Sequence, residues 1–280
     1  MDWIRKVSQK GCADSLKERL DVILVNRGFF QSRERAKAAV MEGVVYVDGQ
    51  KVDKAGTGIK EDAEIFIKED TCPYVSRGGL KLAKAIDSFQ LKLAGLVAVD
   101  IGASTGGFTD CMLKNGTKKV YSIDVGYGQL DWSLRNDPRV VNMEKVNIRY
   151  LETEKIVEKA DFISIDVSFI SLKLVFPIAA QLLAEDGNLV CLVKPQFEAG
   201  REQVGKKGII RDESVHREVI EKVIGYGEAS GLYPQGLDFS PMTGAKGNIE
   251  YLLLLNRHRG AADYKPVIEA VVKASHDQLY

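Results

Sequence analysis

The sequence predicts an α/β protein in which a doubly wound, mostly parallel sheet follows a small α+β domain. Apolar, strand-sized runs alternate with helical patterns over most of the chain, and a glycine-rich turn follows the first of these runs. A charged segment broken by Pro73 separates them from an N-terminal region of different pattern. The length of 280 residues suits two unequal domains, because single cores stop growing near about 250–300 residues.

The N-terminal region predicts two helices and three strands. Apolar residues recur at helical spacing from Leu16, and Ser32 is placed to cap a second helix. The pair Asp48-Gly49, between two β-rich runs, is a strong hairpin signal. The expected elements are helices over residues 16–24 and 33–41, a hairpin over 43–52 and a strand over 63–67. We therefore expect an N-terminal tail (1–13), a small domain (14–68), a linker (69–76) and a large domain (77–280).

The large domain predicts a seven-stranded sheet whose last strand is antiparallel. Strands that alternate with helices are typical of parallel βαβ units. The last two strands instead face each other across a turn at residues 241–247, which reverses the chain direction. The expected strands cover residues 96–101, 119–124, 140–145, 161–166, 187–193, 237–239 and 248–255, with a helix over 214–229.

Composition excludes several classes of protein. Lys plus Arg equals Asp plus Glu at 39 each, so any basic surface must be local. No apolar run approaches the ~20 residues that span a bilayer, and the N-terminus lacks the apolar core of a signal peptide. The cysteines lie far apart without metal-binding spacing, so we expect reduced thiols, a cytoplasmic protein and no metal site. They are Cys12, Cys72, Cys111 and Cys191.

A glycine-rich turn after the first predicted strand of the large domain indicates a cofactor site. A nicotinamide-binding loop has its second glycine two positions after the first, where this chain has Ser104. Asp124 ends the next strand and is placed to accept hydrogen bonds from a ribose, whereas Asp100 favours an ammonium group over a pyrophosphate. These features favour S-adenosylmethionine. The candidate residues of the turn are Asp100, Gly102, Ala103, Ser104, Thr105, Gly106, Gly107 and Phe108.

Two alternatives stay open at this site. Glycine-rich turns between a strand and a helix also occur for tight packing alone. Asn147 follows the third strand and is placed to read the adenine amino group, but asparagine is equally a turn-forming residue.

Charged residues interrupt or end three apolar runs of the large domain. They are Asp166, Lys194 and Glu250, each near an end of a central strand and beside the glycine-rich turn. Buried charges are costly unless paired, so an ion-pair network that only stabilises the sheet is one explanation, and a catalytic site is the other. Lys81, on a helix that Ser76 could cap, is by itself typical of a solvated surface lysine.

Five motifs in this order resemble the TlyA family, over roughly residues 16–257. They are the runs Ser76-Arg77-x-x-x-Lys81-Leu82, Asp100 to Phe108, Asp166-Val-Ser-Phe-Ile-Ser-Leu, Val193-Lys-Pro-Gln-Phe-Glu198 and Gly247-Asn-Ile-Glu250. That family joins an RNA-binding domain like that of ribosomal protein S4 to an FtsJ-like ribosomal RNA 2′-O-methyltransferase domain, and some members are labelled hemolysins. The resemblance implies a Rossmann-like, S-adenosylmethionine-dependent methyltransferase sheet.

The resemblance further implies a catalytic tetrad of Lys81, Asp166, Lys194 and Glu250, which acts on a cytidine ribose. A 2′-hydroxyl is a poor nucleophile at neutral pH and needs a base. Two neighbouring lysines lower each other's pKa, so that one can be neutral. We expect Lys194 to be the base and Asp166 to orient it, while Lys81 and Glu250 position the hydroxyl.

A basic cluster in the small domain is the expected RNA contact. Basic residues on a helix are by themselves typical of a solvated surface, but the surrounding pattern, from Arg19-Leu20-Asp21 to Gly43-x-Val45-x-Val47-x-Gly49, resembles the S4-type module. The resemblance therefore implies contacts with the phosphates of ribosomal RNA or ribosomal subunits. The candidate residues are Arg27, Arg33, Arg35 and Lys37, together with Arg77 of the large domain.

Other functions receive less support from the sequence. A membrane-lytic protein, as the hemolysin label implies, would need a membrane-spanning stretch or a basic amphipathic helix. Methylation of a base amino group usually employs an Asn or Asp followed by two prolines, whereas Val167 and Ser168 follow Asp166. Cytosine C5 methylation needs a nucleophilic cysteine, and Cys111 and Cys191 fall in a helix and a buried strand. An RNA-binding protein that holds the cofactor without catalysis would not need the tetrad.

Overall fold

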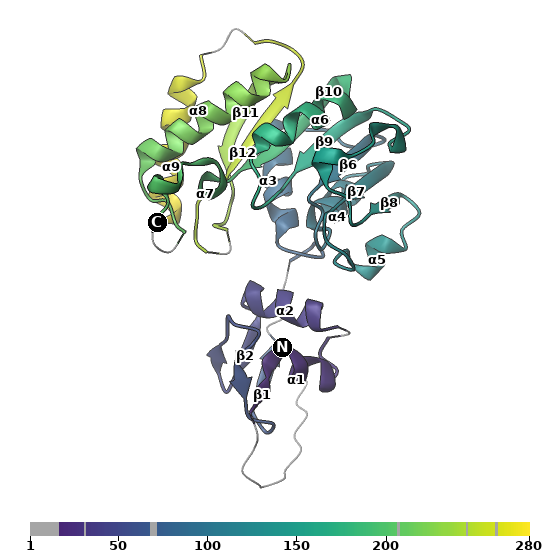
Figure 1. Ribbon diagram of the computed structural model, residues 1–280, viewed down its shortest axis with the longest axis vertical. Helices are drawn as coiled ribbons and strands as arrows, with labels where there is room; N and C mark the ends of the chain where they lie inside the picture. Colours follow the sequence, from purple (N-terminus) through teal and green to yellow (C-terminus); the bar gives the residue numbers. More distant parts are fainter. Residues whose placement is uncertain (1–16, 31, 68–71, 206–207, 245, 261–262) are drawn as a thin grey trace. The chain divides into compact units, whose positions relative to one another are not determined.

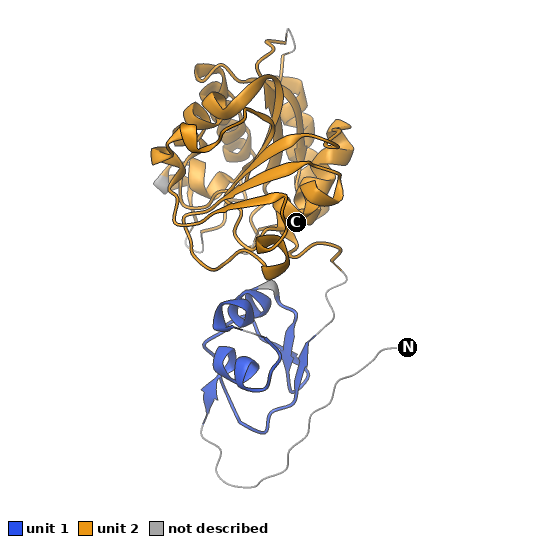
Figure 2. Ribbon diagram, turned by 90° about the vertical axis from the view of Figure 1, so that its right-hand side faces the viewer, with its two compact units in different colours: residues 1–71 blue, residues 72–280 orange. Residues whose placement is uncertain are grey.

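The computed structural model describes residues 17–30, 32–67, 72–205, 208–244, 246–260 and 263–280. The chain forms two compact units, residues 1–71 and 72–280, which we call the small and the large domain (Figure 2). The expected tail at residues 1–13, with Cys12, and residues 69–71 of the expected linker lie outside the described residues.

The small domain packs two helices against short strands. Helices α1 (Leu20–Asn26) and α2 (Arg33–Glu42) precede a three-stranded antiparallel sheet of β2 (Val45–Val47), β3 (Gln50–Lys51) and β5 (Ile65–Ile67). As predicted, the Ser32 side chain caps α2 by accepting a hydrogen bond from the Arg35 amide. Asp48 and Gly49 both have positive φ, as the tight hairpin between β2 and β3 requires.

One feature of the small domain differs from the prediction. The first helix begins at Leu20 because Glu18 and Arg19 form β1 (Glu18–Arg19), which pairs with β4 (Gly58–Ile59). A pair of two-residue strands is too short to produce a recognisable alternation, so the sequence did not reveal it.

The large domain contains, within its described residues, a seven-stranded sheet in the order β11-β12-β10-β9-β6-β7-β8 (Figure 1). Strand β12 runs antiparallel to β10 and β11, as predicted. The strand order reverses at β6, which lies between β7 and β9, and such a switch point is where open α/β sheets bind ligands. The strands are β6 (Val97–Ile101), β7 (Lys119–Ile123), β8 (Val140–Met143), β9 (Ala160–Ile165), β10 (Leu183–Val193), β11 (Tyr233–Phe239) and β12 (Tyr251–Asn256).

Helices bury both faces of this sheet. Alternate residues of β6 point to opposite faces, so Val99 packs in a core with α6, α8 and α9, whereas Ala98 packs in a second core with α3 and α4. The helices are α3 (Gly78–Phe89), α4 (Gly107–Lys114), α5 (Trp132–Arg135), α6 (Phe176–Leu182), α7 (Pro195–Glu198), α8 (Glu213–Ala229) and α9 (Lys265–Leu279). Short 3-10 turns cover Ile148–Tyr150, Thr153–Lys155, Leu172–Leu174 and Arg201–Gln203.

Some element boundaries differ from the prediction. Strand β12 begins at Tyr251 instead of residue 248, because the Asn248 carbonyl accepts a hydrogen bond from the Gly244 amide within the turn. Strand β10 begins at Leu183 instead of residue 187, and α9 was not expected. No helix among the described residues is both long and apolar enough to cross a membrane.

Candidate active site

The glycine-rich turn connects β6 to α4 at the edge where the carboxyl ends of the parallel strands meet (Figure 1). Gly102 has a φ of 89°, and a Cβ there would lie 2.9 Å from the carbonyl carbon of Asp166. Gly106 has a φ of 97°, and a Cβ there would lie 2.8 Å from Leu130. Contacts within the protein therefore require both glycines, whether or not a cofactor also approaches them. Along the turn Ser104 is exposed, Gly102 and Thr105 are half-buried, and Ala103, Gly106 and Gly107 are buried.

Asp124 follows β7 directly and faces the same turn. One carboxylate oxygen accepts a hydrogen bond from the Ser104 amide at 2.8 Å, and the other accepts one from the Gly126 amide at 2.6 Å. The side chain is only half-buried, and each oxygen has a second lone pair. Asp124 is therefore held rigidly and can accept further hydrogen bonds from hydroxyl groups.

Asp100 and Phe108 lie at the two ends of the glycine-rich turn, and both side chains are buried. Asp100 is fully buried and accepts hydrogen bonds from Thr109 at 2.7 Å and Ser164 at 2.9 Å. Burial raises the pKa of this carboxyl group to about 7. Phe108 lies in the core beside Leu82. A direct contact between Asp100 and an ammonium group, as the sequence suggested, is therefore not available, because the sheet and α4 enclose the carboxylate.

Asn147 has the turn-forming role that the sequence left open. It caps the 3-10 turn at Ile148–Tyr150, and its side-chain oxygen accepts a hydrogen bond from the Arg149 amide at 3.1 Å. Recognition of an adenine by the same side chain stays a prediction.

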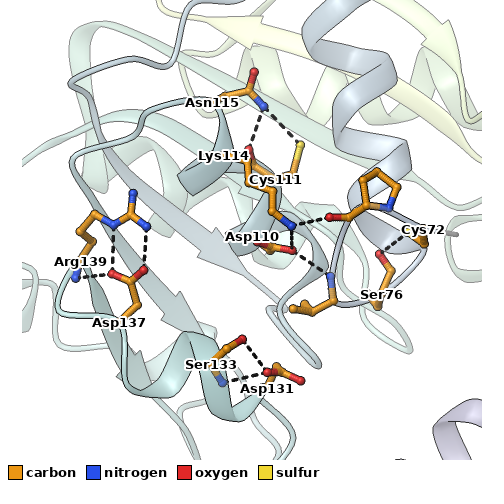
Figure 3. Close-up of polar contacts among 12 residues, drawn as sticks. Cys72, Ser76, Asp110, Cys111, Lys114, Asn115, Asp131, Ser133, Asp137 and Arg139 are labelled. Carbon is orange, nitrogen blue, oxygen red and sulfur yellow. Dashed lines mark hydrogen bonds and ion pairs between the residues drawn. The ribbon is translucent and has the colours of Figure 1, made fainter. Parts of the chain in front are cut away.

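The segment before α3 is anchored to α4, the helix that the glycine-rich turn begins (Figure 3). The Asp110 carboxylate accepts hydrogen bonds from the Val75 amide and from Lys114, both at 2.9 Å, and Lys114 also donates to the Pro73 carbonyl. These contacts fix the start of α3, the helix that carries Lys81, relative to the turn.

The four residues of the predicted tetrad form two partly buried ion pairs. Lys81 on α3 lies 2.6 Å from Glu250, which immediately precedes β12. Lys194, between β10 and α7, lies 2.5 Å from Asp166, which immediately follows β9. The pairs are close enough for Asp166 to raise the pKa of Lys81. Four elements that are distant in sequence thus bring the predicted residues together.

The pKa of Lys81 is raised, although the sequence suggested that two neighbouring lysines lower each other's pKa. Burial alone would lower its pKa, but the nearby carboxylates of Asp166 and Glu250 outweigh burial and raise it. The idea that neighbouring lysines lower each other's pKa is therefore wrong for Lys81, because each lysine has a carboxylate of its own at hydrogen-bond distance. Lys81 is a cation at neutral pH.

Ser168 and Phe169 join the site, although the sequence did not single them out. Lys194 donates a hydrogen bond to the Ser168 hydroxyl at 3.1 Å. The Phe169 side chain is 89% exposed, and its backbone φ is 63°, which is uncommon for a bulky residue. Its ring centroid lies 4.9 Å from that of Phe197. Both new residues follow Asp166 in the chain, but nothing in the local pattern predicts an exposed ring with positive φ.

Glu198 joins the segments that follow Asp166 and Lys194, the two residues of the second ion pair. Its buried carboxylate accepts hydrogen bonds from the Ser171 hydroxyl and the Leu172 amide, each at 2.7 Å. The segment that follows Asp166 is thereby fixed to α7, which follows Lys194.

The basic residues predicted to contact RNA have different surroundings. Arg33 forms a hydrogen-bonded ion pair with Asp21, a fully buried carboxylate that also binds Arg19. Arg27 donates to the carbonyl oxygens of Ala63 and Glu61. Arg27 and Arg33 thus stabilise the small domain. Arg35 and Lys37 are half-buried, and Arg77 is exposed at the start of α3.

Comparison with known families decides the class of protein. The FtsJ-like methyltransferase family matches residues 74–257, and the S4 domain family matches residues 18–65. The chain belongs to the FtsJ-like methyltransferase family. In this methyltransferase the two ion pairs and the glycine-rich turn lie within the matched region.

Individual relatives cover most of the chain. The methyltransferase is 51% identical to YqxC of Bacillus subtilis, over 86% of each chain. It is 40% identical to the 16S/23S rRNA (cytidine-2′-O)-methyltransferase TlyA of Mycobacterium tuberculosis, over 85% of this chain and 90% of that protein. The solved structure of a Streptococcus thermophilus protein named as a hemolysin is 47% identical, with a TM-score of 0.75. The match covers 94% of this chain and 96% of that one.

Proposed function

We propose that this methyltransferase transfers a methyl group from S-adenosylmethionine to a ribose 2′-hydroxyl of ribosomal RNA, with a cytidine as the target. The observation that supports this most strongly is the presence of two partly buried ion pairs, Lys81–Glu250 and Lys194–Asp166, beside the glycine-rich turn. The similarity to TlyA, a ribosomal RNA cytidine-2′-O-methyltransferase, supports the choice of substrate. Ribosomal RNA and reduced cysteines both favour the cytoplasm as the place of action.

The residues around Asp124 fit S-adenosylmethionine. Two backbone amides hold the carboxylate, whose remaining lone pairs suit the two hydroxyls of a ribose. Dinucleotide-binding sheets use an acidic residue for the ribose in the same way, so Asp124 alone does not discriminate between the two classes of cofactor. Ser104, exposed in the turn, can contact the ligand, whereas Asp100 only positions the turn. When bound, the cofactor supplies an electrophilic methyl group on a sulfonium.

The tetrad would prepare the acceptor hydroxyl. We assign Nζ of Lys194 as the acceptor of the proton from the 2′-hydroxyl. Asp166 and Ser168 orient this nitrogen. The proton of the 2′-hydroxyl would pass to this nitrogen as the ribose oxygen attacks the methyl group. Lys81 remains cationic and would stabilise the developing negative charge on the ribose oxygen, while Glu250 holds Lys81 in place.

The small domain would bind the RNA backbone. Arg35 and Lys37 lie on α2, and Arg77 is exposed on the large domain. Contacts with phosphates of this kind position an enzyme on RNA without reading its sequence. Arg33 would contribute less, because the buried Asp21 already engages it.

The experiment that tests the proposal maps 2′-O-methyl groups by mass spectrometry after ribosomal subunits are incubated with the protein and S-adenosylmethionine. Lys194→Ala and Asp166→Ala should each reduce the transfer rate by about 100-fold or more, the usual range for loss of a general base. Lys84→Ala is the matched control, because Lys84 lies on the same helix as Lys81 but pairs with Asp238 at 3.0 Å.

Two binding measurements complete this experiment. Asp124→Ala should weaken S-adenosylmethionine binding in calorimetry by about 1.5–3 kcal/mol, the cost of lost charge-assisted hydrogen bonds. Lys37→Glu should weaken RNA binding and make it less sensitive to salt. Parental transfer rates in the Lys194 or Asp166 variant would refute the catalytic assignment, and unchanged cofactor affinity would refute the assignment of Asp124.

A further inference from the structure

A closed ring of hydrogen bonds surrounds the segment that carries Glu250. Tyr251, the next residue, is fully buried, and its hydroxyl lies 2.6 Å from Nδ1 of His216 on α8. Nε2 of His216 lies 3.2 Å from the Ile210 carbonyl oxygen. The Ile210 amide in turn donates to the Asn248 side chain at 3.0 Å. The ring thus leaves the chain at Tyr251 and returns to it at Asn248, with Glu250 between them.

The chemistry of the ring defines the state of His216. A carbonyl oxygen only accepts, so Nε2 carries the hydrogen that is donated to Ile210. Nδ1 is then the acceptor, and the Tyr251 hydroxyl donates to it. Burial lowers the pKa of His216 to about 4, in agreement with a neutral ring. Protonation of Nδ1 would reverse this hydrogen bond, because a protonated Nδ1 can only donate.

The C-terminal helix, α9, contacts the ring. Ser275 on α9 lies 3.1 Å from the Tyr251 hydroxyl, and Nε2 of His276 lies 3.2 Å from Nδ1 of His216. Tyr280 donates to the same Ile210 carbonyl at 3.1 Å. Three side chains near the end of the chain thus contact the ring, although α9 follows the last strand of the sheet.

We propose that this ring of hydrogen bonds, which α9 contacts, positions Glu250 against Lys81. Tyr251 and His216 are then positioning residues for methyl transfer. The proposal rests on the proposed function, because it assumes that Glu250 takes part in catalysis. Glu250 is only 3% exposed and 2.6 Å from Lys81, so a small displacement of its backbone would lengthen this ion pair. A misplacement of about 1 Å can reduce an enzymatic rate by about 100-fold.

The ring also explains a feature of the neighbouring loop. Asn248 uses both ends of its amide, since it accepts from Ile210 and donates to the Gly208 carbonyl at 2.8 Å. The loop before α8 and the segment before β12 are therefore joined as one unit. Loss of the hydrogen bond at Tyr251 should therefore displace Ile210 and Asn248 as well as Glu250.

The test replaces Tyr251 by phenylalanine in the full-length protein. This substitution removes the hydroxyl and keeps the aromatic side chain. Methyl transfer to ribosomal subunits should lose about tenfold in kcat, with the KM for S-adenosylmethionine unchanged, as expected for misplacement without loss of binding. Hydrogen exchange at the Ile210 amide should accelerate. Tyr121→Phe removes a comparably buried tyrosine hydroxyl from β7 outside the ring and is the matched control.

Ser275→Ala provides a second variant if Tyr251→Phe does not fold, because it removes one hydroxyl at the edge of the ring, which lies 3.1 Å from the Tyr251 hydroxyl and also donates to the Val272 carbonyl within α9. It should show the same changes in kcat and in exchange, to a smaller extent. The proposal is overturned if the folded variants keep the parental kcat, or if exchange at Ile210 matches that of Tyr121→Phe. A parent protein that does not methylate RNA would instead refute the proposed function, while the exchange measurement would still decide whether the ring holds this segment.

Discussion

Replacement of Gly102 by alanine tests how the glycine-rich turn and the ion pairs depend on each other. The φ of 89° at Gly102 is unfavourable for any L side chain, and alanine there should cost about 1 kcal/mol. The new Cβ would also lie 2.9 Å from the Asp166 carbonyl carbon and closer still to its oxygen. Real contacts of a Cβ are longer than 3.0 Å, so the two segments must separate.

The consequences follow from the position of Asp166. Overpacking of a tight contact costs about 1–3 kcal/mol, so the free energy of unfolding should fall by about 2–4 kcal/mol in total. Because Asp166 holds Lys194 at 2.5 Å, a shift of its backbone should also reduce kcat by about tenfold or more. Gly95→Ala is the matched control, since Gly95 has a φ of 79° but no atom within 4 Å of the new Cβ.

Chemical denaturation and methyl transfer should be measured on both variants. Gly95→Ala should lose about 1 kcal/mol of stability, the cost of positive φ, and keep the parental kcat. Gly102→Ala should lose more stability and lose activity as well. If the two variants were equally stable and equally active, the close approach between the turn and Asp166 would have no energetic consequence, and the reasoning would be refuted.

Two further predictions concern pH. The hydrogen bond from Arg19, together with Arg33, lowers the pKa of the buried Asp21 to about 2, so its contribution to stability is present above about pH 4 and is lost as the pH falls towards 2. Asp21→Asn should remove this acid dependence from hydrogen exchange in α1, and an unchanged acid profile would contradict it. Burial raises the pKa of Asp100 to about 7, so the parent should lose stability as the pH rises from about 4 to 7. Asp100→Asn should therefore gain stability relative to the parent between pH 5 and pH 8 in urea unfolding, and an equal difference at both pH values would argue against a raised pKa.

The sequence determined the elements and the candidate residues because both depend on local patterns. Alternating and helical apolar periods located the strands of the large sheet, the turn at residues 241–247 implied the antiparallel last strand, and Ser32 marked the start of α2. Asp166, Lys194 and Glu250 were recognisable because a charge at the end of an apolar strand is costly and therefore conspicuous. Lys81 joined them only through the resemblance to the TlyA family.

Tertiary structure decided what those residues do, because partners from distant segments set burial, pairing and pKa. Asp100 looked like a ligand-binding carboxylate, but Thr109 and Ser164 enclose it. Lys81 looked like a solvated surface lysine, yet it pairs with Glu250, which lies 169 residues further along the chain, and the carboxylates of Asp166 and Glu250 raise its pKa. Arg33 looked free for RNA, but it pairs with Asp21. Local sequence reports a residue's chemistry, whereas the electrostatic energy of that residue depends on neighbours that only the folded chain supplies.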